Sequence, residues 1–175
     1  MKISIFFIIT FFLFGCTGTK YKPTRESLEK EKLCNIVTYK VATKLKNEKK
    51  LIPCGSGGQT MHGVKKLTLS FEYHKPVDID SGRELLVSSV QAFIDAVNEE
   101  KLIRPYLSNY PFTAQNVHIE VFLREVNGLC FISARQGAMQ YDIRNTNGRL
   151  ETIYRETYEE AVQKLEEQKN FRERT

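Results

Sequence analysis

The sequence predicts a single small α+β domain with a mostly antiparallel or mixed sheet of about five strands and three helices, in the order α-β-α-β-β-β-β-α. Three observations support this class. The length of 175 residues suits one modest domain. Strand-type alternation gathers late in the chain, where Asn-Gly pairs at residues 127–128 and 147–148 indicate hairpin turns. Apolar residues at helical spacing occur in three separate stretches.

The first helix is expected over residues 25–49, because Thr24 can cap it. The second is expected over residues 83–100, and the third begins at Thr157. Each stretch has an apolar face that predicts burial against a sheet. The apolar positions are Leu28, Leu33, Ile36, Val37, Val41 and Leu45, then Leu86, Val90, Phe93, Ile94 and Val97, then Tyr158, Ala161, Val162 and Leu165.

The first strand is expected over residues 66–73, where apolar and polar side chains alternate. The glycine-rich residues 53–59 before it are expected to form a loop. The hairpins make the later strands mostly antiparallel, and helices on one face would complete the domain. These later strands are expected over residues 117–126, 129–134, 139–144 and 150–155.

The first sixteen residues form a targeting segment. Lys2 precedes an apolar run over residues 3–14, which is too short to span a membrane as a helix, since that takes about 20 residues. The segment ends in Leu-Phe-Gly-Cys at residues 13–16. This end resembles the lipobox of bacterial lipoproteins, although Phe14 is bulkier than the residue commonly found there. The resemblance covers residues 1–16 only.

The lipobox resemblance implies a lipid anchor. It implies cleavage between Gly15 and Cys16, a diacylglyceryl thioether on Cys16 and acylation of the new N-terminus, with palmitate as the expected chain. The alternatives are an ordinary signal peptide with an incidental Cys and an uncleaved anchor. Thr17, in place of a retention-type Asp, points to the outer membrane facing the periplasm where the source has one. The expected parts are a signal peptide at 1–15, a lipidated Cys and linker at 16–24 and one domain at 25–175.

Most of the positive charge lies close to the expected lipid. Residues 20–50 hold ten Lys or Arg and four Glu, a net charge of +6, whereas residues 51–175 hold fifteen basic and seventeen acidic residues, a net charge of −2. The basic segment is expected to face anionic headgroups or a partner, or else to be a solvated helix face. Nucleic acid is not expected as a partner, because the basic residues lack interleaved aromatic residues.

Three cysteines remain once Cys16 carries lipid. An oxidising envelope permits a Cys34–Cys54 disulfide, and three free thiols are the alternative, because sequence alone does not settle connectivity. Cys130 lies among apolar strand residues and is expected to be a buried thiol. No metal ion or cofactor is expected, since the three His have no recognised ligand spacing.

The leading functional hypothesis is a non-enzymatic binding or scaffolding module for another envelope or secretion component. The aromatic connection at residues 103–112 supplies its expected contact residues, although packing across the sheet edge explains the same pattern. Those contact residues are Tyr106, Tyr110 and Phe112.

The rival hypotheses are a small-ligand carrier and an exported hydrolase or thiol-dependent enzyme. The enzyme would use the glycine-rich segment, but that segment matches neither a nucleophile elbow nor a phosphate-binding loop. Its candidate residues are Cys54, Ser56 and His62.

Overall fold

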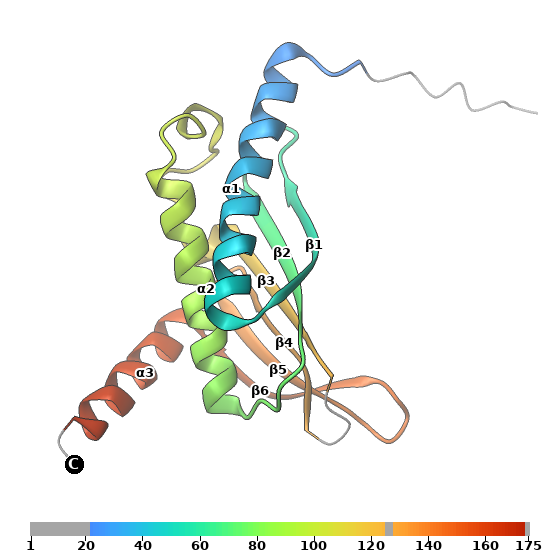
Figure 1. Ribbon diagram of the computed structural model, residues 1–175, viewed down its shortest axis with the longest axis vertical. Coiled ribbons are helices and arrows are strands. Elements are labelled where there is room, and N and C mark those ends of the chain that lie inside the picture. Colours follow the sequence, from blue (N-terminus) through green and yellow to red (C-terminus); the bar gives the residue numbers. More distant parts are fainter. Residues whose placement is uncertain (1–21, 125–127, 174–175) are drawn as a thin grey trace, which may run out of the picture.

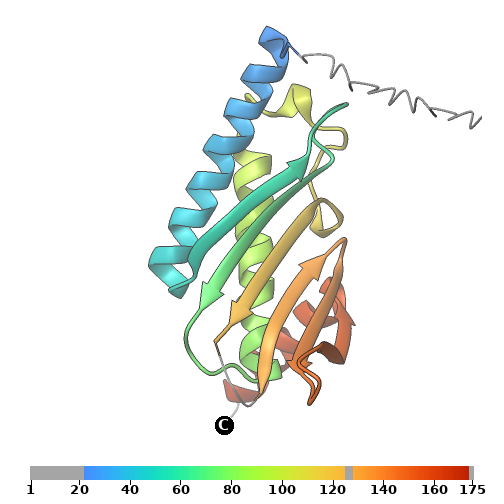
Figure 2. The ribbon, with the colours of Figure 1, turned by 90° about the vertical axis from the view of Figure 1, so that its right-hand side faces the viewer.

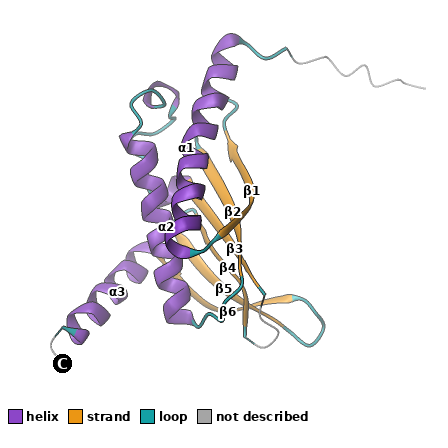
Figure 3. Cartoon of the chain, in the orientation of Figure 1, coloured by secondary structure: helices purple, strands orange, loops and turns teal. Residues whose placement is uncertain are grey.

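The computed structural model describes residues 22–124 and 128–173 (Figure 1). Within these residues, three α-helices and a six-stranded sheet form two layers, as Figure 3 shows. The helices lie on one face of the sheet, and no described segment covers the other face (Figure 2). The predicted α+β class is therefore confirmed. The sheet has one strand more than predicted, and the observed order is α-β-β-α-β-β-β-β-α.

Helix α1 (Arg25–Lys49) begins where the hydroxyl of Thr24 accepts a hydrogen bond from the backbone N–H of Ser27 at 3.1 Å. Two residues expected on its buried face, Leu28 and Ile36, are instead 52% and 47% exposed. They lie to one side of a row with i, i+4 spacing that packs against the sheet and the neighbouring helix. The residues of that buried row are Leu33, Val37, Val41 and Leu45.

The additional strand is β1 (Ile52–Gln59), where the sequence predicts a loop at residues 53–59. Glycine weakens strand propensity, so the sequence signal is lost there. The backbone of β1 nevertheless pairs antiparallel with β2 (Lys66–Tyr73), because ladder hydrogen bonds need no side chain. The alternation predicted for β2 is confirmed by its buried residues Leu67, Leu69 and Phe71.

Helix α2 (Ile79–Glu99) carries the chain from β2 to β3 (Val117–Leu123). This crossover makes β2 and β3 a parallel pair in an otherwise antiparallel sheet. Asp78 caps the helix, since its carboxylate accepts a hydrogen bond from the backbone N–H of Ser81 at 2.8 Å. The helix then covers the middle of the sheet, where it packs against β3 and its neighbouring strands on the same face as α1.

Three antiparallel strands complete the sheet: β4 (Leu129–Arg135), β5 (Ala138–Arg144) and β6 (Leu150–Thr157). The sheet order is therefore the chain order from β1 to β6. Both predicted hairpin pairings are present. Asn127 of the first turn lies outside the described residues, and Gly148 of the second turn has a φ of 75°, which glycine adopts without strain.

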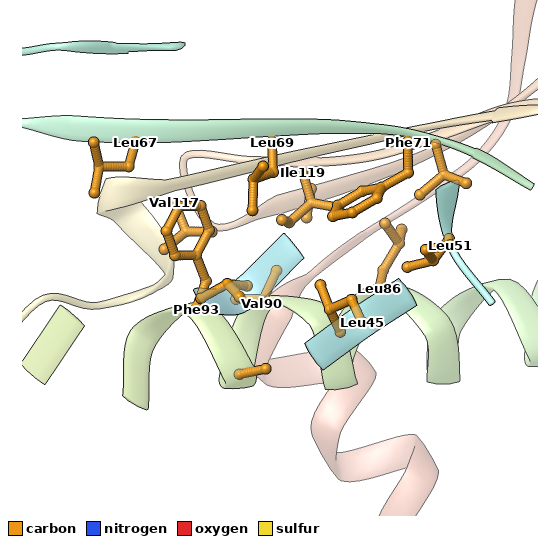
Figure 4. Close-up of a cluster of buried hydrophobic side chains, with 14 of the residues drawn as sticks. Leu45, Leu51, Leu67, Leu69, Phe71, Leu86, Val90, Phe93, Val117 and Ile119 are labelled. Atoms are coloured by element: carbon orange, nitrogen blue, oxygen red, sulfur yellow. The ribbon is translucent and has the colours of Figure 1, made fainter. Parts of the chain in front are cut away.

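Helix α3 (Tyr158–Arg172) begins after Thr157, as predicted, and packs against β6 and α2. The hydrophobic core lies between the helices and the sheet (Figure 4). Side chains from β2 and β3 meet those of α2 there, and Leu45 of α1 joins them. The residues labelled in that view are Leu45, Leu51, Leu67, Leu69, Phe71, Leu86, Val90, Phe93, Val117 and Ile119.

Candidate functional site

Strand β1 is an edge strand whose protection against further pairing is confined to its first residues. It is the first strand of the sheet, so within the described residues only one of its edges pairs, and every residue from Ile52 to Gln59 is exposed. It carries no charged residue, and its bulge and only proline lie at its beginning. The opposite edge strand β6 carries exposed Glu151 and Arg155, the kind of residue that discourages strand pairing. The edge of β1 is therefore open to a further strand.

The pairing register fixes which face each β1 residue occupies. Ser56 lies opposite Leu69 and Gly58 opposite Leu67. Residues opposite one another in a ladder point to the same face, so Ser56 and Gly58 lie on the helix-covered face. Gly57 lies opposite a polar residue, Thr68, on the uncovered face. The side of β1 that faces α1 thus carries only small side chains in this region.

A groove of about 800 Å³ runs between β1 and α1. One wall comes from α1, including Lys30, Cys34 and Asn35, and the other comes from residues 56–61. A smaller hollow of about 380 Å³ continues along β1 toward its first residues and shares Asn35 with the groove. The two hollows together follow much of the length of β1.

Exposed apolar side chains border the groove. Met61 just after β1 lines the groove and is 83% exposed, whereas Tyr39 of α1 lines the smaller adjoining hollow and is 75% exposed. Leu28 and Ile36, which the sequence predicts as core, share with Tyr39 a shallow hollow on the outer side of α1. Apolar side chains that gather at one rim are typical of an interaction surface.

The predicted disulfide is not formed in the structure. Cys34, Cys54 and Cys130 are free thiols, with Cys34 and Cys130 buried and Cys54 exposed. Cys34 lies on the buried face of α1, whereas Cys54 lies near the carboxylates of Glu72 and Glu120. The predicted lipidation residue Cys16 and the cleavage residue before it lie outside the described residues.

The aromatic connection differs from the predicted contact surface. Phe112 is only 1% exposed, so it is a core residue and the expectation that it contacts a partner is corrected. Tyr106 is partly buried against the same core. Tyr110 is 53% exposed and lies under the guanidinium of Arg104, 4.9 Å from the ring centre. The connection bonds through its backbone to Val64, between β1 and β2, and Tyr110 alone of the three predicted residues is exposed.

The residues of the predicted enzyme are not assembled into one site. Ser56 points to the helix-covered face, whereas Cys54 is placed close to the carboxylates of Glu72 and Glu120. Burial and those two carboxylates raise the pKa of Cys54, which favours the thiol over the nucleophilic thiolate. His62 is exposed in the segment between β1 and β2. Within the described residues, no cluster of three or more His, Cys, Asp or Glu is suited to a metal ion.

A polar row on the uncovered face joins residues far apart in the chain. The hydroxyl of Ser70 donates a hydrogen bond to Glu120 at 2.7 Å, and Nε2 of His118 lies 3.3 Å from the other oxygen of Glu120. A hydrolytic relay needs the imidazole between the hydroxyl and the acid, whereas here the acid lies between them. Burial lowers the pKa of His118. We interpret the row as cross-strand pairing of the sheet.

A buried ion cluster, which the sequence reasoning did not find, joins α2, the last strands and α3. The carboxylate of Glu156 accepts hydrogen bonds from Arg83 at 2.8 Å, from the hydroxyl of Tyr141 at 2.7 Å and from Lys164 at 2.9 Å. The side chain of Glu156 is 1% exposed and that of Arg83 is 5% exposed. Asp80 also pairs with Arg83. Each buried charge thus has an opposite charge beside it, and the cluster links α2 to β5, β6 and α3.

Acid is expected to weaken this cluster. Burial alone would raise the pKa of Glu156, but hydrogen bonds from Tyr141, Arg83 and Lys164 outweigh it and hold the pKa below its ordinary value of 4.5. The unfolded chain then takes up the proton first, so the stability that Glu156 contributes is complete above pH 4.5 and is lost as the pH falls through the folded-state pKa. Below about pH 5 the melting temperature should fall more steeply for the wild type than for Glu156→Gln, and equal slopes would contradict this assignment.

Comparison with known proteins gives no relative. No family model, no curated protein and no solved structure matches this chain. Among the residues that the structure describes, no helix has the length and apolar character needed to cross a membrane.

Proposed function

We propose that this protein is a lipid-anchored lipoprotein of the bacterial envelope that acts as a non-enzymatic binding or scaffolding module for another envelope or secretion component. The groove between α1 and β1 is its binding surface. The observation that carries this proposal is the open, uncharged edge of β1 beside a groove of about 800 Å³, with exposed Met61 in the groove lining and exposed Tyr39 in the adjoining hollow. Pockets of several hundred Å³ with mostly apolar walls are typical of binding sites.

The position of the groove suits a membrane-anchored module. Pro23 lines one end of the groove, and it lies seven residues after Cys16. Seven extended residues reach about 25 Å at most, so an anchor on Cys16 would keep the groove close to the membrane surface. The basic residues of α1 add attraction to anionic headgroups. A partner in the same envelope would then meet the groove at high local concentration.

Site-specific photo-crosslinking in living cells tests the location of the binding surface. A photoreactive phenylalanine in place of Tyr39, which lines the hollow that adjoins the groove, is expected to give discrete crosslinked products on irradiation. The matched position is Tyr110, which is also an exposed tyrosine but lies in the aromatic connection. Products from Tyr110 with none from Tyr39 would move the binding surface to the connection and contradict the proposal.

A further inference from the structure

We propose that the side of α1 that faces away from the sheet docks on the surface of an anionic lipid bilayer, with Leu28 and Ile36 inserted at the level of the headgroups. This inference rests on the lipid anchor of the function proposed above. It adds the face through which the folded domain contacts the membrane. Helices that lie in the plane of a bilayer insert apolar side chains at this depth and carry Lys or Arg beside them.

One row of residues runs along α1 on the side opposite its buried row. Its members are three or four positions apart, so they lie along the same side of the helix. From Arg25 to Lys46 the row extends about 32 Å, at 1.5 Å per residue. We call this row the outer stripe. It consists of Arg25, Leu28, Lys32, Ile36, Tyr39, Thr43 and Lys46.

The apolar side chains of the outer stripe are open to solvent. Leu28 is 52% exposed, Ile36 is 47% exposed and Tyr39 is 75% exposed. Together with Lys32 they line one shallow hollow, so they form a continuous surface. Figure 2 shows α1 at one margin of the molecule, with the sheet and α2 both on the same side of the helix. The outer stripe therefore offers apolar surface to something outside the described part of the chain.

The charge of the outer stripe points to an anionic occupant. Helix α1 holds seven Lys or Arg and four Glu, a net charge of +3. The stripe contains three of these basic residues and none of the acidic ones, and Glu29 and Glu31 lie beside it. Lys20 and Lys22, which precede the helix, add two positive charges at the end nearest Cys16. Anionic headgroups attract Lys and Arg that are held near them, so the two surfaces are complementary.

The order of apolar and basic residues suits a membrane interface. Lys32 lies between Leu28 and Ile36 along the stripe. A lysine can lay its methylenes along apolar surface and keep its ammonium among the headgroups. Tyrosine is enriched at the same depth, because its ring is apolar and its hydroxyl is polar. Leu28 and Ile36 can therefore enter the bilayer without burying a charge.

The proposed anchor can hold the outer stripe against the membrane. Arg25 follows Cys16 by nine residues, and nine extended residues reach about 32 Å at most. The helix thus meets headgroups at high local concentration, where a weak attraction is sufficient for docking. Tyr39 also lines the hollow that adjoins the groove. The groove would then open beside the headgroups, where a membrane-bound partner is found.

A second copy of the chain fits the outer stripe less well than lipid does. Pairing of two outer stripes would bring the three basic residues of each copy close together, and like charges at such distances are destabilising. An acidic protein would match the charge, but it would have to displace the headgroups beside which the anchor holds the helix. We therefore assign the outer stripe to anionic lipid.

Tryptophan fluorescence of the full chain reconstituted in vesicles tests this docking. The chain has no tryptophan, so Ile36→Trp introduces a single reporter. Ile153→Trp is the matched control, because Ile36 and Ile153 are 47% and 48% exposed and Ile153 lies on β6, at the opposite edge of the sheet from β1. The vesicles contain phosphatidylglycerol and a phosphatidylcholine that is brominated near its headgroup. An interfacial helix buries its apolar face roughly 5–10 Å deep, so bromine should quench Ile36→Trp at least about threefold more than Ile153→Trp.

Reversal of one basic residue tests the contribution of charge. In the Ile36→Trp chain, Lys32→Glu should lower the quenching by at least about half, because it places a negative charge against anionic headgroups. The same change at an exposed lysine of α3, Lys169→Glu, should leave the quenching unchanged. Equal quenching of the two charge variants would contradict the choice of an anionic surface.

Flotation of the same samples with the vesicles separates this inference from the anchor. A chain that floats with the vesicles but is quenched equally at Ile36→Trp and Ile153→Trp keeps its anchor and overturns docking of the outer stripe. Equal quenching together with the mass of a dimer would overturn it and assign the stripe to a second copy. A chain that does not float would overturn both the anchor and the docking. Crosslinks from Tyr39 in cells would still support the groove as the binding surface in these cases.

Discussion

Replacement of Glu156 by Ala is expected to lower the free energy of unfolding by about 3–5 kcal/mol, because it leaves a buried charge without its partner. Arg83 is 5% exposed and donates to Glu156 at 2.8 Å, so the guanidinium would lose its most buried acceptor. The hydroxyl of Tyr141 would lose the same acceptor. Urea denaturation followed by circular dichroism measures this change.

Two further variants show whether the buried charge causes the loss. Glu166 is an exposed glutamate of α3, and Glu166→Ala should change the free energy of unfolding by less than about 0.5 kcal/mol. The double replacement Arg83→Met with Glu156→Leu removes both charges and should recover most of the stability, since apolar residues of similar volume often substitute for a buried pair. A Glu156→Ala variant as stable as Glu166→Ala would contradict the structural role of the cluster.

Replacement of Cys16 by Ala is expected to move the protein from the membrane fraction to the soluble or unprocessed pool and to remove incorporation of labelled palmitate. Each buried methylene contributes about 0.8 kcal/mol, so two or three acyl chains hold a protein firmly on a membrane. Without the thiol of Cys16, the diacylglyceryl group has no attachment point and the anchor is lost. Cell fractionation and metabolic labelling measure the two effects.

A matched cysteine in the same chain controls this experiment. Cys54 is an exposed free thiol in β1, so Cys54→Ala should keep both the label and the membrane location. Equal palmitate labelling of the wild type and Cys16→Ala would contradict the anchor. Loss of label in Cys54→Ala, with the label kept in Cys16→Ala, would assign the acylation to a site other than the lipobox.

The sequence was sufficient for the elements whose side chains carry a pattern. The alternation of β2 predicted its buried face, and Asn-Gly pairs predicted the hairpins, because in both cases local chemistry determines the structure. β1 was missed for the opposite reason. Its glycines carry no side-chain pattern, and its structure depends on backbone pairing with β2, which no side chain of β1 signals.

The candidate groove could not be predicted, since it is formed by elements whose packing the sequence does not specify. Leu28 and Ile36 fit the apolar stripe of α1 by spacing, and only the packing of that helix on the sheet shows that they are exposed. The ion cluster was missed because Arg83 and Glu156 are 73 residues apart. Phe112 was assigned to a surface because an aromatic residue in a connection has the same pattern whether it is buried or exposed.

Recovery of envelope proteins with groove-blocked variants tests the central claim most directly. Asn35 and Asn47 are both exposed asparagines of α1, but only Asn35 lines the groove. Membrane extracts of the wild type, Asn35→Trp and Asn47→Trp, purified in parallel and quantified by mass spectrometry, provide the measurement. We expect proteins enriched with both the wild type and Asn47→Trp to fall at least about tenfold with Asn35→Trp, a loss of about 1.4 kcal/mol in binding. Equal recovery with all three proteins would contradict the assignment of the groove as the binding surface.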